Sequence, residues 1–121
     1  MVIEKFEDIK AWQKARELVK DIYRLSNNNL SKDFGLKDQL RRASVSIMAN
    51  IAEGFDSQSD QEFIKFLIYS RRSATEVQSH LYVAYDQKYL TKEDFDYLYS
   101  KLQEIKQLIC GFIRYLNQPN K

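Results

Sequence analysis

Apolar residues recur at steps of three and four positions along most of the chain, and this periodicity constrains the fold more than any other feature. The clearest series lies near the C-terminus: Phe95, Leu98, Leu102, Ile105, Ile109, Phe112 and Leu116. This spacing places every member on one face of an α-helix, whereas a half-buried strand needs an apolar residue at every second position. The sequence therefore predicts an all-α protein.

Four amphipathic segments are separated by three short breaks. We expect helices over about residues 7–26, 36–54, 59–88 and 91–116. The chain contains three glycines and one proline, the two residues that helix interiors tolerate least. Short connections make consecutive helices antiparallel, so we expect an antiparallel up-down four-helix bundle in which residues 1–121 form a single domain.

Several residues predict how individual helices begin and end. Ser59 followed by Glu62 matches a capping box, and Thr91 is suited to cap the last helix. Gly54 follows the second apolar series, where a glycine in the left-handed conformation often ends a helix. Gly111 interrupts the last series at a cost of about 1 kcal/mol relative to alanine, so we expect it to mark a close contact.

The sequence lacks the motifs of several enzyme and membrane classes. It contains no nucleophile-elbow motif and no glycine-rich phosphate loop. One cysteine, Cys110, and one histidine, His80, predict neither a disulfide nor a metal site. No apolar run is long enough to span a membrane, and the first residues do not resemble a signal peptide. We expect a non-enzymatic cytoplasmic protein without metal or cofactor.

The third predicted helix carries a second apolar row outside its core-facing residues. Ile64, Ile68 and Tyr82 lie on this row, and we predict that they form an oligomer interface. Tyrosine is enriched at interfaces, and five cluster in sequence around the third connection: Tyr82, Tyr85, Tyr89, Tyr97 and Tyr99. The alternative is that these are scattered surface residues of the ordinary kind.

Polar residues flank the apolar rows of the second and third helices. The flank residues that we assign to a structural polar network are Gln39, Arg42, Asn50, Glu53 and Glu76. If the two helices are antiparallel, Arg42 comes level with Glu76, and we predict a contact between them. A polar layer of this kind fixes helix register, and a ligand or RNA site is the alternative interpretation.

Adjacent arginines on the same two helices predict a basic patch. Lys37, Arg41, Arg71 and Arg72 are the candidate residues for contact with RNA or DNA phosphates. The net charge of +2 and the isoelectric point near 8.6 neither require nor exclude such a partner. Ordinary solvated charges with internal ion pairs are the alternative.

One stretch of the second helix resembles a known protein family. Residues 35–54 read GLKDQLRRASVSIMANIAEG, and the other matching positions are Trp12, Ala15, Phe63, Phe66, Leu67 and Glu76. This pattern resembles the four helix bundle proteins encoded in 23S rRNA intervening sequences, which are often named as ribosomal proteins because of where their genes lie. The sequence departs from that family at Arg72, where glycine is usual.

The resemblance implies a four-helix bundle that assembles into a ring-shaped homopentamer. The related accessory protein of diversity-generating retroelements is a similar basic pentamer that binds nucleic acid and a reverse transcriptase. The expected partners are therefore further copies of this chain and RNA or DNA. We predict a non-enzymatic, self-associating bundle that serves as an oligomeric scaffold, and the alternative is a protein–protein adaptor with no nucleic-acid role.

Overall fold

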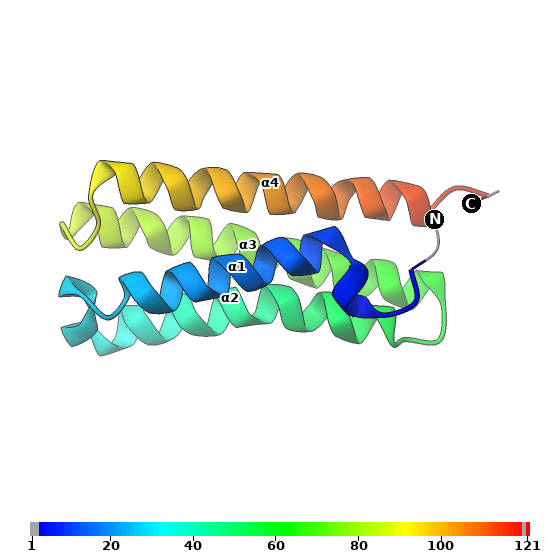
Figure 1. Ribbon diagram of the computed structural model, residues 1–121, viewed down its shortest axis with the longest axis horizontal. Coiled ribbons are helices and arrows are strands. Elements are labelled where there is room, and N and C mark those ends of the chain that lie inside the picture. Colours follow the sequence, from blue (N-terminus) through cyan, green and yellow to red (C-terminus); the bar gives the residue numbers. More distant parts are fainter. Residues whose placement is uncertain (1–2, 120) are drawn as a thin grey trace.

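Four long helices form an antiparallel bundle in the computed structural model, which describes residues 3–119 and 121 (Figure 1). The helices are α1 (Lys10–Leu25), α2 (Phe34–Phe55), α3 (Asp60–Asp86) and α4 (Lys92–Leu116). Two short 3-10 helices, η1 (Phe6–Asp8) and η2 (Asn29–Lys32), precede α1 and α2. Within the described residues there is no strand. The predicted all-α, up-down four-helix architecture is confirmed.

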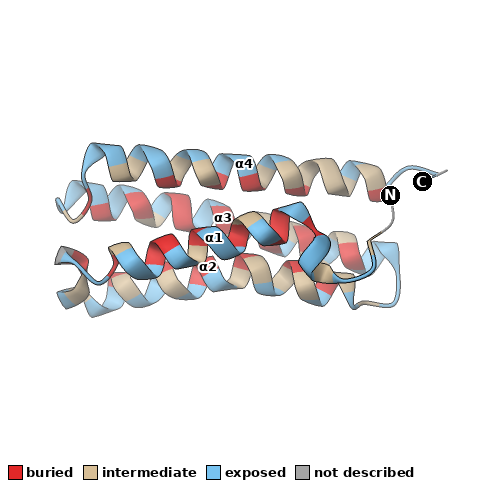
Figure 2. Cartoon of the chain, viewed as in Figure 1, coloured by how far each residue is buried: buried red, intermediate tan, exposed pale blue. Residues whose placement is uncertain are grey.

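Each helix packs against two neighbours, in the cyclic order α1, α2, α3, α4. The α2–α3 interface is the most extensive and the α1–α4 interface the least. Buried residues lie on the inward side of every helix (Figure 2), with Leu18, Ile47, Leu67 and Leu102 fully enclosed. Each such side chain contributes about 1.5–3 kcal/mol by leaving water, which is why the apolar periodicity determines the fold.

Two helices begin at positions that differ from the expected ones. α1 begins at Lys10 rather than near residue 7, because residues 6–8 form the 3-10 helix η1 and the backbone of Ile9 after it is extended (φ −76°, ψ 120°). α2 begins earlier than expected, at Phe34, because Oδ1 of Asp33 accepts the backbone N–H of Leu36 at 3.2 Å. An aspartate in this position caps the first turn of a helix.

The predicted caps of α3 and α4 are confirmed. Oγ of Ser59 accepts the N–H of Glu62 at 3.2 Å, and Oγ1 of Thr91 accepts the N–H of Asp94 at 3.1 Å. Among the described residues, every helix is too short or too polar to span a membrane.

Gly54 does not end α2 in the left-handed conformation, so that prediction is wrong. The helix continues to Phe55, and no described glycine has a positive φ. A methyl group on Gly54 would lie 2.8 Å from Cδ1 of Phe63 and 2.8 Å from Cβ of Phe66. Glycine is therefore needed here because α2 and α3 approach closely at their shared turn.

Gly111 makes no close contact with the residues that the structure describes, contrary to the expectation from sequence. An added methyl group would find Nη2 of Arg114 as its nearest neighbour, 3.7 Å away. Among the described residues, the one with a positive φ is Lys88, with φ of 65°, in the α3–α4 connection. Its N–H bonds to the carbonyl of Tyr85 at 2.9 Å, which closes the end of α3.

Candidate functional site

Arg41, one of the four predicted phosphate contacts, is anchored to the end of α1. Its Nε donates to Oγ of Ser26 at 2.8 Å, and its Nη2 donates to Oδ1 of Asn27 at 2.9 Å. Its guanidinium also lies 4.3 Å from the ring centroid of Tyr23. These contacts orient Arg41 and tie α1 to α2.

The other three predicted cations point in different directions. Lys37 lies over the ring of Phe34, with 5.2 Å between Nζ and the ring centroid. Arg71 reaches toward α4, where its Nη1 lies 3.7 Å from Sγ of Cys110. Arg72 is exposed on α3. Because Arg41 faces α1 and Arg71 faces α4, one chain does not bring the four cations together.

The predicted contact between Arg42 and Glu76 is not formed. Arg42 instead pairs with Asp38 one turn earlier on α2, at 3.9 Å, and Glu76 lies 3.3 Å from Nε2 of His80. Both pairs link residues four apart on one helix, which are nearest neighbours on a helix surface. His80 thus has a hydrogen-bond partner on its own helix.

A smaller polar bridge links α2 and α3 at this level. The hydroxyl oxygens of Ser46 and Ser73 are 2.9 Å apart, and Nδ2 of Asn50 donates to Oγ of Ser46 at 3.0 Å. Gln39 and Glu53, the remaining members of the predicted network, are exposed. Of the predicted set, only Asn50 takes part in this bridge between the helices.

The predicted interface residues form an open row on α3. Ile64 and Ile68 are half-buried, and Tyr82 is 52% exposed. The ring of Tyr82 packs edge-on against Phe95 and Tyr99 of α4, with centroids 4.9 and 6.0 Å apart. Side chains that pack on the fold while keeping exposed apolar surface suit a contact with another molecule.

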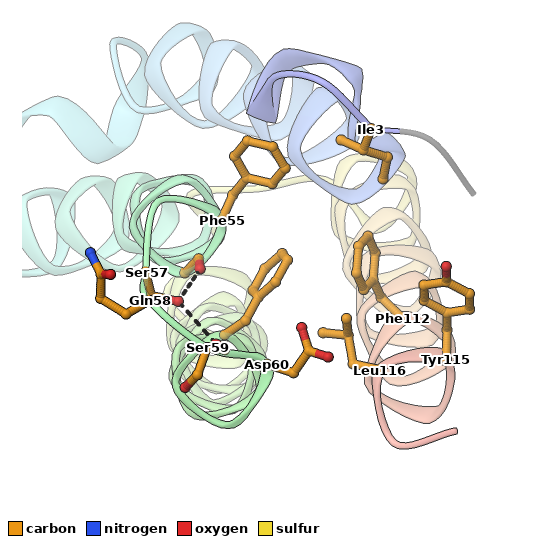
Figure 3. Close-up of a pocket in the computed structure, with 11 residues that line it drawn as sticks. Ile3, Phe55, Ser57, Gln58, Ser59, Asp60, Phe112, Tyr115 and Leu116 are labelled. Atoms are coloured by element: carbon orange, nitrogen blue, oxygen red, sulfur yellow. Dashed lines mark hydrogen bonds between the residues drawn. The ribbon is translucent and has the colours of Figure 1, made fainter. Parts of the chain in front are cut away.

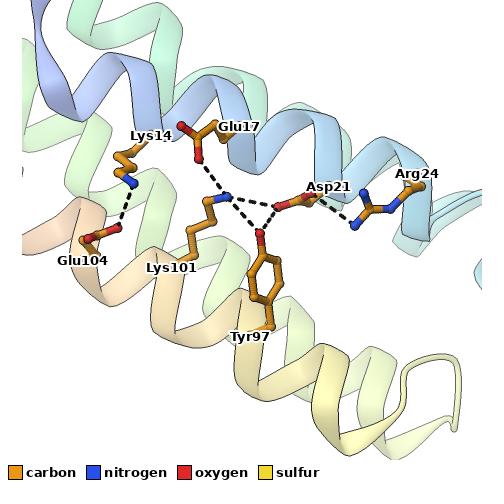
Figure 4. A network of polar contacts seen from close by, with 7 residues as sticks. All are labelled: Lys14, Glu17, Asp21, Arg24, Tyr97, Lys101 and Glu104. Atoms are coloured by element: carbon orange, nitrogen blue, oxygen red, sulfur yellow. Dashed lines mark hydrogen bonds and ion pairs between the residues drawn. The ribbon is translucent and has the colours of Figure 1, made fainter.

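The tyrosine cluster expected around the third connection divides into separate contacts. Tyr85 packs against Phe95, whose ring in turn stacks on Tyr99, whereas the hydroxyl of Tyr89 donates to Asp33 at 3.2 Å. Burial and this bond to a carboxylate raise the pKa of Tyr89. Tyr97 points toward α1 (Figure 4).

The most basic element is α1, which the adjacent-arginine pattern did not identify. It carries five cations and two acids, whereas α2 carries three cations and two acids. Arg16, Lys20 and Arg24 are exposed and four residues apart, so they line up along one side of the helix. The spacing of these three residues is visible in the sequence and would have indicated the row.

The two acids of α1 are held by Lys101 of α4 (Figure 4). Nζ of Lys101 lies 3.1 Å from Glu17, 3.3 Å from Asp21 and 3.0 Å from the hydroxyl of Tyr97, which itself donates to Asp21 at 2.9 Å. Arg24 adds a 3.2 Å contact to Asp21. Within this cluster Lys101 offsets much of the acidic charge, so the surface of α1 stays basic.

The pKa values in this cluster follow from the same contacts. The hydrogen bond from Lys101, and then its charge, lowers the pKa of Glu17. Partial burial would lower the pKa of Lys101, but its bonds to Tyr97, Glu17 and Asp21 outweigh burial and raise it. Lys101 is therefore charged across the physiological pH range.

A shallow depression of about 740 Å³ lies beside this basic surface, between Tyr23 of α1 and the outer face of α2. The α2 residues that line it are Asp38, Arg41, Arg42, Val45, Ser46, Ala49, Asn50 and Glu53. Along α2, the small side chains of Val45, Ser46 and Ala49 lie between charged side chains at the two ends of the depression. All eight of these α2 residues lie within residues 35–54, the stretch whose sequence resembles the family, so one surface displays much of that motif.

A second hollow of about 290 Å³ lies at the C-terminal end of α2, near the α2–α3 turn (Figure 3). Phe55, Phe63 and Phe112 supply its aromatic walls. The hydroxyl of Ser57 on its rim donates to the carbonyl of Gly54 at 2.5 Å, so it is engaged in shaping the turn. This hollow follows from the turn and the close helix approach.

Comparisons with known proteins agree with this fold. Residues 7–111 match the family described as 23S rRNA-intervening sequence protein. The crystal structure of a protein with unknown function from the S23 ribosomal protein family of Bacteroides thetaiotaomicron is similar, with a TM-score of 0.79 and 28% identity over 86% of this chain and 98% of that chain. No curated protein matches significantly. Because the family match covers most of its length, this chain belongs to the 23S rRNA-intervening sequence protein family.

Proposed function

We propose that this chain is a non-enzymatic, self-associating helical bundle that binds RNA or DNA through the outer surface of α1 and α2. The observation that carries the proposal is the uneven distribution of charge. Together α1 and α2 hold eight cations and four acids, whereas α3 and α4 hold seven cations and eight acids. The small net charge of the chain is therefore the sum of one basic pair of helices and one pair in which cations and acids nearly balance.

The row on α1 has the spacing that phosphate contacts need. Two of its three members, Arg16 and Lys20, have no acidic partner in the part of the chain that the structure describes, whereas Arg24 contacts Asp21. Successive members are about 6 Å apart along the helix axis, from the rise per residue. Lys20 is exposed and has no partner among the described side chains, and Arg16 has only the ring of Trp12, at 5.9 Å. Exposed cations that neutralise phosphates release counterions, so the resulting affinity depends on salt.

Replacing Arg16, Lys20 and Arg24 together with glutamine tests the nucleic-acid part of the proposal. We expect the plot of log affinity against log salt to become shallower by roughly 2, since each lost phosphate contact removes about 0.7–0.9. Fluorescence anisotropy with a labelled RNA measures this slope. The matched control replaces Lys65, Lys88 and Arg114, which are exposed on the other side. Equal losses in both variants would contradict the proposal.

The self-association part rests on the open row of α3. We propose that copies of the chain meet through Ile64, Ile68 and Tyr82, with a ring of five as the expected assembly. Analytical ultracentrifugation of Ile68→Glu should show a smaller species than the unsubstituted protein. Glu76→Lys provides a charge-changing control on the same helix, because Glu76 is exposed and lies about 80° around α3 from Ile68. A monomeric unsubstituted protein at micromolar concentration would argue against this assembly.

The alternative role is a protein–protein adaptor. The exposed ring of Tyr82, backed by Phe95 and Tyr99, favours it because aromatic side chains often anchor protein interfaces. An adaptor would keep a defined protein partner after nuclease treatment and lose it in Tyr82→Ala. It would also bind RNA and DNA no better than a neutral protein at low salt.

A further inference from the structure

Tyr23 forms a fixed aromatic platform on the basic side of the molecule. Its side chain is 41% exposed, and the guanidinium of Arg41 lies 4.3 Å from the ring centroid. Arg41 is itself held by Ser26 and Asn27, so the stacked pair is organised before any ligand arrives. Organisation of this kind lowers the entropy lost on binding.

We propose that Tyr23 and the depression beside it bind one unpaired base of a single-stranded nucleic acid. Unpaired bases stack on aromatic rings and on arginine planes, and each stacked base contributes about 1–3 kcal/mol. The depression of about 740 Å³ is within the usual range for small ligands. This inference rests on the proposed function, because it assigns a binding site within the basic surface.

The lining of the depression suits the edge of a base. Nδ2 of Asn50 is engaged with Ser46, which leaves its Oδ1 available as an acceptor. Asp38 and Glu53 on the rim also present acceptor oxygens, and amino groups of bases are donors. Ala49 also lines the depression, and its small side chain leaves room for a base.

Cations near the depression are placed to contact the phosphates of the bound strand. Lys20 and Arg24 flank Tyr23 on α1, and the guanidinium of Arg42 reaches solvent with 79% of its side chain exposed. These groups suit phosphates on either side of a stacked base. A duplex keeps its bases paired, so it would meet the cations without using the platform, and it would bring its phosphates near the carboxylates of Asp38 and Glu53.

The test compares labelled single-stranded RNA, single-stranded DNA of the same sequence and the corresponding duplex, each of about 12 nucleotides. For the unsubstituted protein, we expect tighter binding of single strands than of the duplex at equal salt. Tyr23→Ala should weaken single-strand binding about 5- to 100-fold, whereas Tyr23→Phe should preserve it. Duplex binding should change less than twofold in both variants.

Ala49→Leu provides a second test that leaves the core untouched, because Ala49 is exposed. Filling the depression should weaken single-strand binding, whereas Gln87→Leu at the exposed end of α3 should not. If Ala49→Leu weakens the binding of both RNA and DNA, the result supports stacking of the base. If it weakens RNA binding more, the site also contacts the 2′-hydroxyl.

Two results separate the inference from the proposed function. Single-strand binding that is salt-dependent but unchanged in Tyr23→Ala and Ala49→Leu overturns the base site while leaving the basic surface in place. Preference for the duplex overturns it in the same way. If the unsubstituted protein binds none of the probes at about 50 mM salt, both the base site and the proposed nucleic-acid function are overturned.

Discussion

Two glycines show how the surroundings of a residue decide its role. Gly54 and Gly111 both lie inside helices, where glycine is about 1 kcal/mol less favourable than alanine. A side chain at Gly54 would collide with Phe63 and Phe66, whereas a methyl group at Gly111 would make an ordinary van der Waals contact with Nη2 of Arg114 at 3.7 Å. The sequence shows the same residue in both helices, and only the packing separates them.

Substituting these glycines with alanine should have opposite effects. Gly54→Ala should lower the free energy of unfolding by about 1–2 kcal/mol, because the overpacking cost exceeds the gain in helix propensity. Gly111→Ala should raise it by about 0.5–1 kcal/mol. Urea denaturation of both variants measures the difference. A stabilised Gly54→Ala protein would show that α2 and α3 do not approach as described.

Lys88 offers a stabilising change at the residue scale. Its φ of 65° is costly for a side chain with a Cβ atom and is readily adopted by glycine. Lys88→Gly should therefore raise the melting temperature, with a gain of about 1 kcal/mol in unfolding free energy. Lys88→Ala is the control, because it removes the charge and keeps the Cβ; a similar gain there would point to charge rather than backbone conformation.

At the scale of helices, the polar cluster around Lys101 joins the least extensive interface, α1–α4. The side chains of Lys101 and Asp21 are 12% and 11% exposed, so the pair is largely shielded from water. Lys101→Met should lower the free energy of unfolding by about 2–3 kcal/mol, because Asp21 would lose a partner while remaining buried. Adding Asp21→Leu should recover part of the loss, and strictly additive effects would show that the two residues do not interact.

Glu17 gives the same interface a dependence on pH. Its folded-state pKa lies below the ordinary value of 4.5, so its contribution to stability is present above that pH. The contribution disappears as pH falls below about 4.5, through the folded-state pKa. Chemical denaturation between pH 7 and pH 3, on the order of the range where carboxylates titrate, should show a smaller decline in Glu17→Gln than in the unsubstituted protein. Equal declines would contradict the predicted role of Glu17.

The helices were predicted correctly from the sequence and the basic row on α1 was missed, for a common geometric reason. Apolar residues three and four apart meet a neighbouring helix together, as the series ending at Leu116 does. Adjacent residues diverge by about 100° around a helix, so Arg71 and Arg72 point away from each other. The row of Arg16, Lys20 and Arg24 follows the favourable spacing. In the sequence, however, Glu17 and Asp21 lie between these cations and, counted alone, offset their charge, because the contacts of both acids with Lys101 are seen only in the structure.

At the scale of the whole molecule, the bundle has two distinct surfaces. The basic surface covers α1 and α2, and the open apolar row lies on α3 next to α4. Association through α3 would leave α1 and α2 of each copy accessible. Several equivalent basic surfaces in one assembly would strengthen binding to a long nucleic acid by increasing its effective concentration.

Photo-crosslinking followed by mass spectrometry tests most directly which side of the molecule binds nucleic acid. A single-stranded RNA that contains 4-thiouridine is irradiated with the unsubstituted protein, and the crosslinked peptides are mapped. We predict crosslinks within residues 16–24 and 41–50, with Tyr23 among the modified positions. Crosslinks confined to α3 and α4 would contradict the assignment of the nucleic-acid surface to α1 and α2.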